Sequence, residues 1–448
     1  MTDEGAPQCP PRRAGWREAV RGNVLMMGLV SLFTDFSSEM MNPLMPIFIA
    51  GLVGGQWAAF YVGLTEGIAE TTASVLKIFS GRISDKIGKR KALVVLGYGL
   101  STVARPMMAL AGLVGKAWAA WQIVGLKFFD RAGKGVRTSP RDALIGDSVG
   151  PGVRGLAFSF HCSMDHLGAV LGPLAAIGLL YALLGYAKWG KFSGGADQGV
   201  PAEEMTALRW LFGVALIPGV AAMLSLIWKV KEIAPRRSAD PAGQGGGKAS
   251  VRRLLPRRFY AFVTIVTLFA LGNSSDMFLL LYGWQIFRFG LMEIIVLWIV
   301  LHVSKIVFSL PGGAISDRIG RRPVIVAGWL VYALVYLGMA VVDGKQVWQF
   351  WALFLVYGFY YGMSEGAEKA LVADFVPSEH RGTAFGIYHG AVGLAALPAS
   401  LLFGAWWTQI GPQWAFGIGA SLAGLAAVLM IVLLSTTRSA KAQAGSRE

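Results

Sequence analysis

The sequence predicts an all-α polytopic membrane protein whose twelve spanning helices form two similar six-helix halves. Of its 448 residues, 54% are hydrophobic and 15% are charged, whereas about a quarter of the residues of a soluble domain are charged. Apolar stretches close to the roughly 20 residues that a spanning helix needs recur from Met26 to Leu434. Backbone in lipid must satisfy its own hydrogen bonds, so we expect these stretches to be helices.

The expected spans follow one another with short polar connections. The first half is expected to hold spans at residues 24–50, 57–80, 92–114, 117–146, 155–184 and 207–230. The second half is expected at 258–284, 290–311, 323–343, 347–373, 382–408 and 413–435. Residues 1–23 and 436–448 are predicted tails, 188–204 an external loop, and the Gly-rich, basic segment 231–257 a flexible linker.

The formal net charge of +15 is concentrated in short connections rather than spread over the chain. Basic clusters precede the first span, follow spans 2 and 8, and fill the linker, as at Arg17, Lys86, Arg237 and Arg318. This is the positive-inside distribution of an inner-membrane protein with both termini cytoplasmic, and no nucleic-acid partner is indicated. No cleavable signal is predicted, and Cys9 and Cys162 do not indicate a disulfide framework.

Two motif pairs repeat between the halves at similar offsets. Gly81-Arg-Ile-Ser-Asp85-Lys-Ile-Gly88-Lys-Arg follows span 2, and Gly313-Ala-Ile-Ser-Asp317-Arg-Ile-Gly320-Arg-Arg follows span 8. Ala143–Phe158 is similarly echoed by Ala370–Phe385. Repeated units at matching positions indicate two halves of one topology around a central cavity.

The doubled motif resembles the signature loop of the major facilitator superfamily of secondary transporters, over roughly residues 20–437. The resemblance implies that family's fold and transport by alternating access. Gly168, Gly172 and Pro173 in span 5 are similar to the motif of proton-antiporting members, although Ala175-Ala176 stands where Gly-Gly is usual. Span 4 has Asp130-Arg131-Ala-Gly133 instead of the Arg and Gln-Gly of typical drug exporters.

The signature loops are expected to act as latches between helices. Asp85 would pair with Arg141 or Arg154, and Asp317 with Arg381, in one state and release them in the other. The alternative is plain turn chemistry, with glycine permitting the tight turns. The full predicted gating set is Gly81, Asp85, Gly88, Arg90, Arg137, Arg141, Asp147, Arg154, Gly313, Asp317, Gly320, Arg321, Asp374 and Arg381.

Ionisable residues also lie at membrane depth, where charge is costly and indicates either a site or a pairing network. The predicted substrate and proton-coupling set is Asp35, Glu39, Glu66, Glu70, Lys127, Asp130, Arg131, Lys134, Glu365, Glu368 and Lys369. Further candidates outside that set are Asp165, His166, Asp276, His302 and Lys305. Asp35, Glu66 and Glu70 are the predicted proton carriers, with Arg131 and Lys134 as competing cations. A static salt-bridge network is the alternative.

A soft-metal site is a minority hypothesis. Met41 and Met45 lie four apart in span 1, and His161 lies in span 5. Thioether and imidazole ligands suit copper, but methionine is also a common filler of apolar cores. We therefore predict no metal.

Together these features predict a proton-coupled exporter of a small polar or anionic organic solute. The alternatives are an importer of a nutrient or of copper, and a non-transporting membrane sensor or scaffold. We expect a monomer whose partners are its substrate and the bilayer, with a proton gradient as energy source and no cofactor. No nucleotide loop, Ser–His–Asp order or zinc-ligand spacing indicates an enzyme.

Overall fold

The structure is a computed structural model that describes residues 16–53, 55–113, 115, 118–185, 200–233, 255–287, 291–342 and 345–445. Within these residues every regular element is a helix. The N half contains α1 (Trp16–Ala19), α2 (Asn23–Glu39), η1 (Asn42–Leu44), α3 (Met45–Val53), α4 (Gly55–Ile87), α5 (Arg90–Met107), η2 (Met108–Leu110), α6 (Ala119–Ser148), η4 (Pro151–Val153), α7 (Arg154–Leu184), α9 (Ala202–Val214) and α10 (Leu216–Lys229). The C half contains α12 (Arg257–Gly272), α13 (Met277–Ile286), α14 (Leu291–Ile319), α15 (Arg321–Val341), α16 (Val347–Phe375), η5 (Ser378–His380), α17 (Arg381–Ile410) and α18 (Pro412–Gly445).

Eight of the described helical stretches are long and apolar enough to cross a membrane by length and composition. Helices α4, α6 and α16 are not among them, although each has at least 29 residues. These three helices carry every charge of the predicted substrate and coupling set except Asp35 and Glu39. Charged groups at membrane depth face the interior of a bundle rather than lipid, so the polar composition of these helices marks the interior of the fold.

Three expected spans are broken, and one of them, span 6 over 207–230, is divided at Ala215 between α9 and α10. Span 1 ends at Glu39 and restarts as α3 after η1, where Pro43 cannot donate a backbone hydrogen bond. Span 7, expected as one helix over 258–284, ends at Gly272 and restarts at Met277. The expectation of one continuous helix is wrong because Gly272-Asn-Ser-Ser is a run of poor helix formers.

The signature motifs, expected as loops, are mostly helical. Helix α4 continues to Ile87 and α14 to Ile319, so Asp85 and Asp317 lie in their last turns. Gly88 and Gly320 have φ of 70° and 101°, a conformation that glycine adopts without strain, which confirms the expected tight turns. We call the end of the molecule that carries these two turns the loop face.

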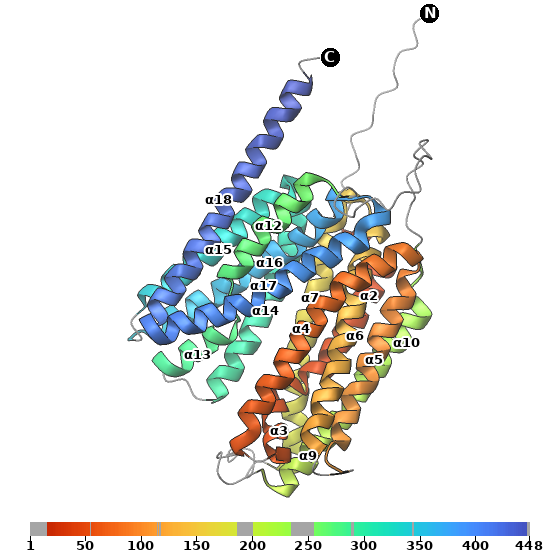
Figure 1. The fold of residues 1–448 in the computed structure, drawn as a ribbon, viewed down its shortest axis with the longest axis vertical. Helices are drawn as coiled ribbons and strands as arrows, with labels where there is room; N and C mark the ends of the chain where they lie inside the picture. Colours follow the sequence, from red (N-terminus) through yellow and green to blue (C-terminus); the bar gives the residue numbers. More distant parts are fainter. Residues whose placement is uncertain are drawn as a thin grey trace, which may run out of the picture.

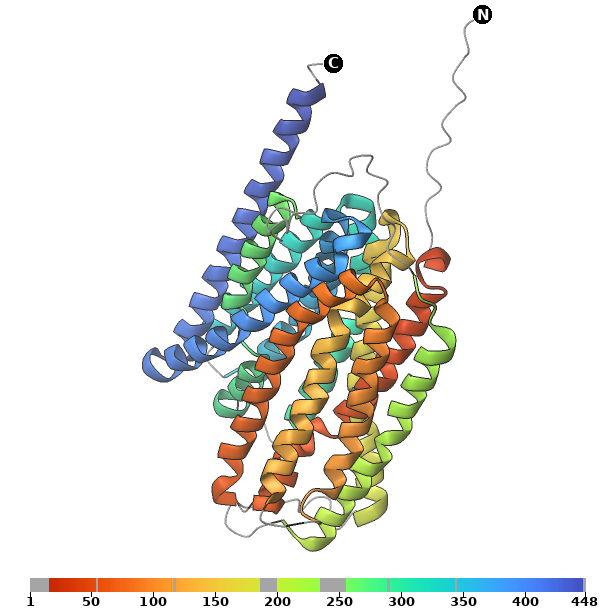
Figure 2. The ribbon, with the colours of Figure 1, turned by 45° about the vertical axis from the view of Figure 1, so that its right-hand side comes forward.

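The two halves stand side by side, and helices of one lie along helices of the other (Figure 1). Helix α4 packs along α17, and α7 packs along α14. The bundles approach each other closely towards one end and diverge towards the other, as both views show (Figures 1 and 2). Helices α4 and α7 of the N half and α14 and α17 of the C half therefore form the seam between the halves.

Several sequence expectations fall on segments that the structure does not describe. Cys9, Arg12, Arg13, residues 186–199 and residues 234–254 lie outside the described residues.

The described start of the linker is fastened to the N half. The Asn23 side chain bonds both backbone groups of Lys231 at 2.8 Å, and the Glu232 carboxylate accepts the N–H groups of Arg90 and Lys91 at 3.0 and 2.9 Å.

Candidate functional site

The carboxylate of the first signature motif binds the start of a helix in the opposite half. Asp85 accepts hydrogen bonds from the backbone N–H groups of Gly382 and Thr383, at 3.0 and 2.5 Å. These groups lie in the first turn of α17, where backbone donors have no partner within the helix. The helix dipole also favours negative charge at this position. Asp85 therefore ties α4 to α17.

The second motif makes the equivalent contact in the reverse direction. Asp317 accepts hydrogen bonds from the N–H groups of Gly155 and Leu156 at the start of α7, at 3.0 and 2.8 Å. The carboxylate also pairs with Arg321, one turn further along the chain. The two motifs thus close the loop face by one device, applied once from each half.

Ion pairs between the halves surround both contacts. Arg381 of the C half pairs with Asp147 of the N half, and Arg90 pairs with the same carboxylate. In the related position of the other half, Arg154 pairs with Asp374 at 2.5 Å. Asp147 and Asp374, which occupy equivalent positions in the two repeated stretches, therefore each bind an arginine of the opposite half. These ion pairs fix the relative position of the two bundles at this face.

The expected partners of the latch carboxylates are wrong. Arg141 pairs with its neighbour Asp142 at 2.9 Å, and Arg154 and Arg381 pair with the repeated aspartates rather than with Asp85 and Asp317. Arg137 remains inside the N half, where it bonds Ser101 at 2.6 Å and lies over the Tyr98 ring. Asp85 and Asp317 instead pair with Arg90 and Arg321 of the same half and accept hydrogen bonds from backbone N–H groups of the opposite half. Sequence pattern cannot single out such backbone donors because almost every residue carries one.

Glycines let the seam helices touch through their backbones. A Cβ atom on Gly81 would overlap the carbonyl oxygen of Gly382, and one on Gly313 would lie 2.6 Å from that of Gly155. In the antiporter-like motif, a Cβ on Gly168 would lie 2.5 Å from the Leu32 carbonyl oxygen of α2. A Cβ on Gly172 of that motif would lie 2.9 Å from the backbone carbonyl carbon of Glu39. The motif therefore packs α7 against α2.

Towards the interior, two of the predicted charges on α6 are neutralised within the N half. Asp130 pairs with Arg105 of α5 at 2.9 Å. Lys127 donates a hydrogen bond to the Asn42 side chain at 3.1 Å, and Asn42 donates to Glu39 at 3.0 Å. Asp130, Arg105 and Lys127 are less than 9% exposed. These side chains hold α2, α5 and α6 together at the break in span 1.

Two further cations of α6, Arg131 and Lys134, lie beside Glu70 of α4. Arg131 pairs with Glu70 at 3.4 Å, and 59% of the Glu70 side chain is exposed. Lys77 and Lys134 lie within electrostatic range of the same carboxylate, and Lys134 is exposed. Asp35 also lies within electrostatic range of Lys134. The side chain of Glu66, on α4, is outside what the structure describes.

Predicted residues of α16 meet α7 across the seam. Glu365 accepts a hydrogen bond from Lys369 at 3.0 Å and lies 3.4 Å from His166. Lys369 also contacts the Cys162 sulfur at 3.3 Å. Glu368 points elsewhere, because its carboxylate accepts hydrogen bonds from Trp329 at 3.0 Å and from Tyr388 at 2.7 Å within the C half.

The break in span 7 carries a second buried ion pair. Asp276, next to the first residue of α13, pairs with Lys305 of α14 at 3.2 Å. The hydroxyls of Tyr357 and Tyr361 donate to the same carboxylate at 2.8 and 3.0 Å, and the Lys305 ammonium lies over the Tyr361 ring. The pair is satisfied by hydrogen bonds on both sides, as a buried ion pair requires.

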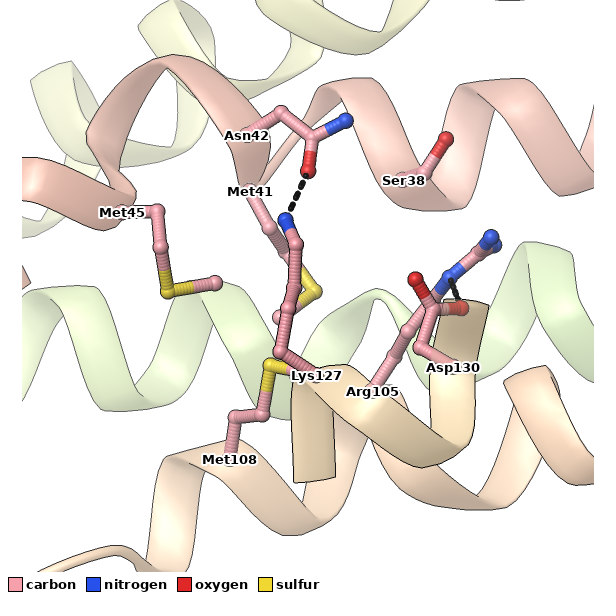
Figure 3. A pocket seen from close by; sticks show the side chains of 8 residues that line it. All are labelled: Ser38, Met41, Asn42, Met45, Arg105, Met108, Lys127 and Asp130. Carbon is pink, nitrogen blue, oxygen red and sulfur yellow. Dashed lines mark hydrogen bonds and ion pairs between the residues drawn. The ribbon is translucent and has the colours of Figure 1, made fainter. Parts of the chain in front are cut away.

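The three minority copper ligands are not brought together. Met41 and Met45 line a cavity of about 10 Å³, room for one water molecule, and Lys127 extends among its methionine side chains (Figure 3). An ammonium group repels a metal cation, and His161 is not among the lining residues. Within the described residues, no group of three His, Cys, Asp or Glu side chains is placed to hold a metal ion. The cavity is lined by Ser38, Met41, Asn42, Met45, Arg105, Met108, Lys127 and Asp130.

Comparison with known proteins agrees with this architecture. The sequence model described as Major Facilitator Superfamily matches residues 27–304 and 300–448. The chain belongs to the Major Facilitator Superfamily. An "Uncharacterized MFS-type transporter" of Methanocaldococcus jannaschii is 32% identical to it over 422 residues, which cover 92% of this chain and 94% of that protein. The present chain is therefore a secondary transporter and not an enzyme.

Further relatives match over part of the chain or in fold. Multidrug resistance protein MdtH of Yersinia pestis is 33% identical over 138 residues, which are 31% of this chain and 32% of that protein. The proton:xylose symporter XylE superposes with a TM-score of 0.72 at 18% identity, covering 93% of this chain and 96% of that one. The human organic anion transporter MFSD10 has a TM-score of 0.67 at 16% identity, covering 94% and 100%. At these identities the two structures indicate the major facilitator fold alone.

The structure also adds residues to the site of this major facilitator protein that sequence reasoning missed. Arg105 neutralises Asp130, Lys77 joins the interior cations, and His389 of α17 bonds Asp142 across the seam at 2.6 Å. Each is a basic residue inside an otherwise apolar stretch. That isolation was a usable signal, since ionisable groups at membrane depth are rarely without a partner.

Proposed function

We propose that this major facilitator transporter exports a small organic anion in exchange for protons, by alternating access across the inner membrane. One observation carries the choice of substrate charge. Lys77, Arg131 and Lys134 gather around the Glu70 carboxylate, and 59% of the Glu70 side chain is exposed. A substrate carboxylate or phosphate would bind the lysines of this cluster, and charge-assisted hydrogen bonds to such groups are strong.

Among the described residues of the opposing half, the acids Glu365 and Asp276 already have basic partners. Glu365 is already bonded to Lys369 and His166, and Asp276 to Lys305 and two tyrosines. A cationic substrate would therefore have to displace an existing partner. An anionic substrate meets Lys77 and Lys134, for which the described contacts include no ion pair of their own within 4 Å.

The orientation that we propose places the loop face in the cytoplasm. Lys86, Lys89 and Arg318 are exposed at this face, and an excess of basic residues in short connections favours the cytoplasmic side. In that orientation the contacts of Asp85 and Asp317 close the cytoplasmic side while the interior cations face outward. Both termini are then cytoplasmic.

Export coupled to protons is supported by two features. The Gly168–Pro173 motif, similar to that of antiporting members, packs α7 against α2 beside Asp35. Part of the chain is also similar to a multidrug resistance protein. Asp35 and Glu70 face the same interior as the cations, so a proton and an anion bound there would compete for one set of charges.

Counterflow in proteoliposomes tests the substrate class. Vesicles loaded with mono- and dicarboxylates, phosphate esters or cationic drugs are diluted into labelled solute of the same class, with and without a pH gradient. We expect exchange of an anionic class, driven by the gradient. Lys134→Gln should raise its KM about tenfold or more, because a hydrogen bond to a charged group contributes about 1.5–3 kcal/mol. Lys89→Gln, exposed at the loop face, is the matched control.

The outcomes separate the candidate functions. Exchange of cationic or neutral solutes alone would overturn the anionic substrate, and exchange that ignores the pH gradient would overturn proton coupling. Failure of every solute class to exchange would favour the sensor or scaffold hypothesis.

A further inference from the structure

A histidine and an aspartate on α7 form the least satisfied polar pair in the described part of the seam. His161 is 0% exposed, and neither of its ring nitrogens has a hydrogen-bond partner. Its Nδ1 lies 3.6 Å from Asp165 Oδ2. The Ser31 hydroxyl of α2 is close to the same carboxylate, but Asp165 Oδ1 is buried without a hydrogen-bond partner. Buried polar groups in folded proteins are nearly always bonded, so each exception calls for a physical explanation.

The surrounding charges are already engaged with one another. Arg141 pairs with Asp142, and Lys369 pairs with Glu365 and contacts Cys162. The titratable and charged groups that face the α7 pair are Asp35 on α2, Arg141 and Asp142 on α6, Cys162 and His166 on α7, His302 on α14, Glu365 and Lys369 on α16, and His389 on α17. Because the neighbouring charges are bonded to one another, they do not supply the missing hydrogen bonds of His161 and Asp165.

The pair also spans the boundary between the open interior and the closed seam. The Asp165 side chain is 21% exposed, whereas His161, one turn closer to the loop face, is buried. Close to His161 along the same helix, Ser159 packs against Gly366 and Gly313 of the C half. A group bound by Asp165 can thus arrive from the interior, while His161 becomes accessible from the other side only when the seam opens.

Arg141 connects the pair to the contacts between the halves. It lies within electrostatic range of both His161 and Asp165 and bonds Asp142 through Nε at 2.9 Å. Asp142 in turn bonds His389 of the C half at 2.6 Å. A change of charge on the α7 pair alters the electrostatic attraction between the pair and Arg141. Through Asp142 it also affects the contact with His389, which must break when the halves separate.

We propose that His161 and Asp165 form a proton-binding site that controls opening of the loop face. A proton held between Nδ1 and Oδ2 gives both groups a partner after a small approach of the side chains, since a hydrogen bond needs about 2.7–3.2 Å. The site lies outside the coupling set predicted from sequence. It rests on the proton coupling proposed above and specifies which groups carry the proton.

The test measures opening without substrate. Spin labels are placed at the exposed residues Lys86 and Arg318, at the ends of α4 and α14, in the full-length chain with Cys9→Ser. Pulsed electron paramagnetic resonance in nanodiscs then reports the distance between the labels from roughly pH 5 to pH 8, the range in which histidine changes charge. We expect the distances of the wild-type chain to redistribute with pH.

Two substitutions should each abolish the pH dependence of the label distances, one in the acidic distribution and the other in the alkaline one. Asp165→Asn, neutral like a protonated carboxyl, should hold the acidic distribution at every pH. His161→Gln, which cannot gain charge, should hold the alkaline one. His380→Gln changes a more exposed histidine at the loop face and should keep the wild-type response. Misfolding would not send two variants to opposite ends of one native distribution.

The inference is overturned if the wild-type distances do not depend on pH, as a static pair bridged by water would predict, or if both variants keep the wild-type response. Because no solute is present, this result is independent of the counterflow screen. A pH response lost in these variants together with a failed screen would leave the proton site standing and remove the anionic substrate.

Discussion

Replacing Asp85 should weaken the closed state of the loop face by an amount that the contacts allow us to work out. The carboxylate accepts two backbone hydrogen bonds, from Gly382 and Thr383, and a hydrogen bond to a charged group contributes about 1.5–3 kcal/mol. Asp85→Ala should therefore destabilise the closed contact by about 3–6 kcal/mol, which is about 100-fold or more in the opening equilibrium. Arg90 keeps Asp147 as a partner, so the substitution leaves no unpaired buried cation.

Hydrogen–deuterium exchange at the start of α17 measures this directly in nanodiscs. The amide hydrogens of Gly382 and Thr383 are the ones that Asp85 protects, so their exchange should accelerate by about the same factor. Asp85→Asn keeps one acceptor oxygen and should give roughly a tenfold effect. Arg82→Gln, an exposed change one turn away, should leave the segment unchanged. Wild-type exchange rates in Asp85→Ala would refute the proposed cap on α17.

Three further predictions concern stability, measured as thermal melting of the purified protein. Gly81→Ala should cost about 1–3 kcal/mol by overpacking the seam, because its Cβ would overlap the Gly382 carbonyl. In the control Gly178→Ala, the added Cβ meets nothing within 4 Å, so the substitution should cost far less. Equal melting of the two variants would contradict the close packing. Asp276→Asn should cost about 3–5 kcal/mol by leaving Lys305 buried without its counter-charge. Asp276→Leu should cost a similar amount, and adding Lys305→Met to it should recover most of that loss. A double variant no more stable than either single variant would contradict the pairing. Glu368→Leu strands the hydroxyl of Tyr388 and the Trp329 N–H and should cost about 1–3 kcal/mol for each. Glu368→Gln keeps an acceptor oxygen for the Trp329 N–H and can donate its amide N–H to the Tyr388 hydroxyl oxygen, so it should melt closer to the wild type.

The sequence by itself determined the membrane helices, the two halves and the position of the signature motifs. These features depend on local properties, namely hydropathy over a spanning length, helix breakers and repeated motifs. Even the break in span 7 was present in local sequence, at Gly272-Asn-Ser-Ser, although we expected a continuous helix. The family followed from the same local patterns.

Only the tertiary structure decided which charges meet. Asp85 was identified from its motif, but its partners in the opposite half are backbone groups almost 300 residues further along the chain. Glu365 and Glu368 are three residues apart on α16, yet one bonds His166 at the seam and the other lies between Trp329 and Tyr388 inside the C half. The physical reason is that the partner of a charge depends on the rotation and packing of whole helices, which no local stretch of sequence records.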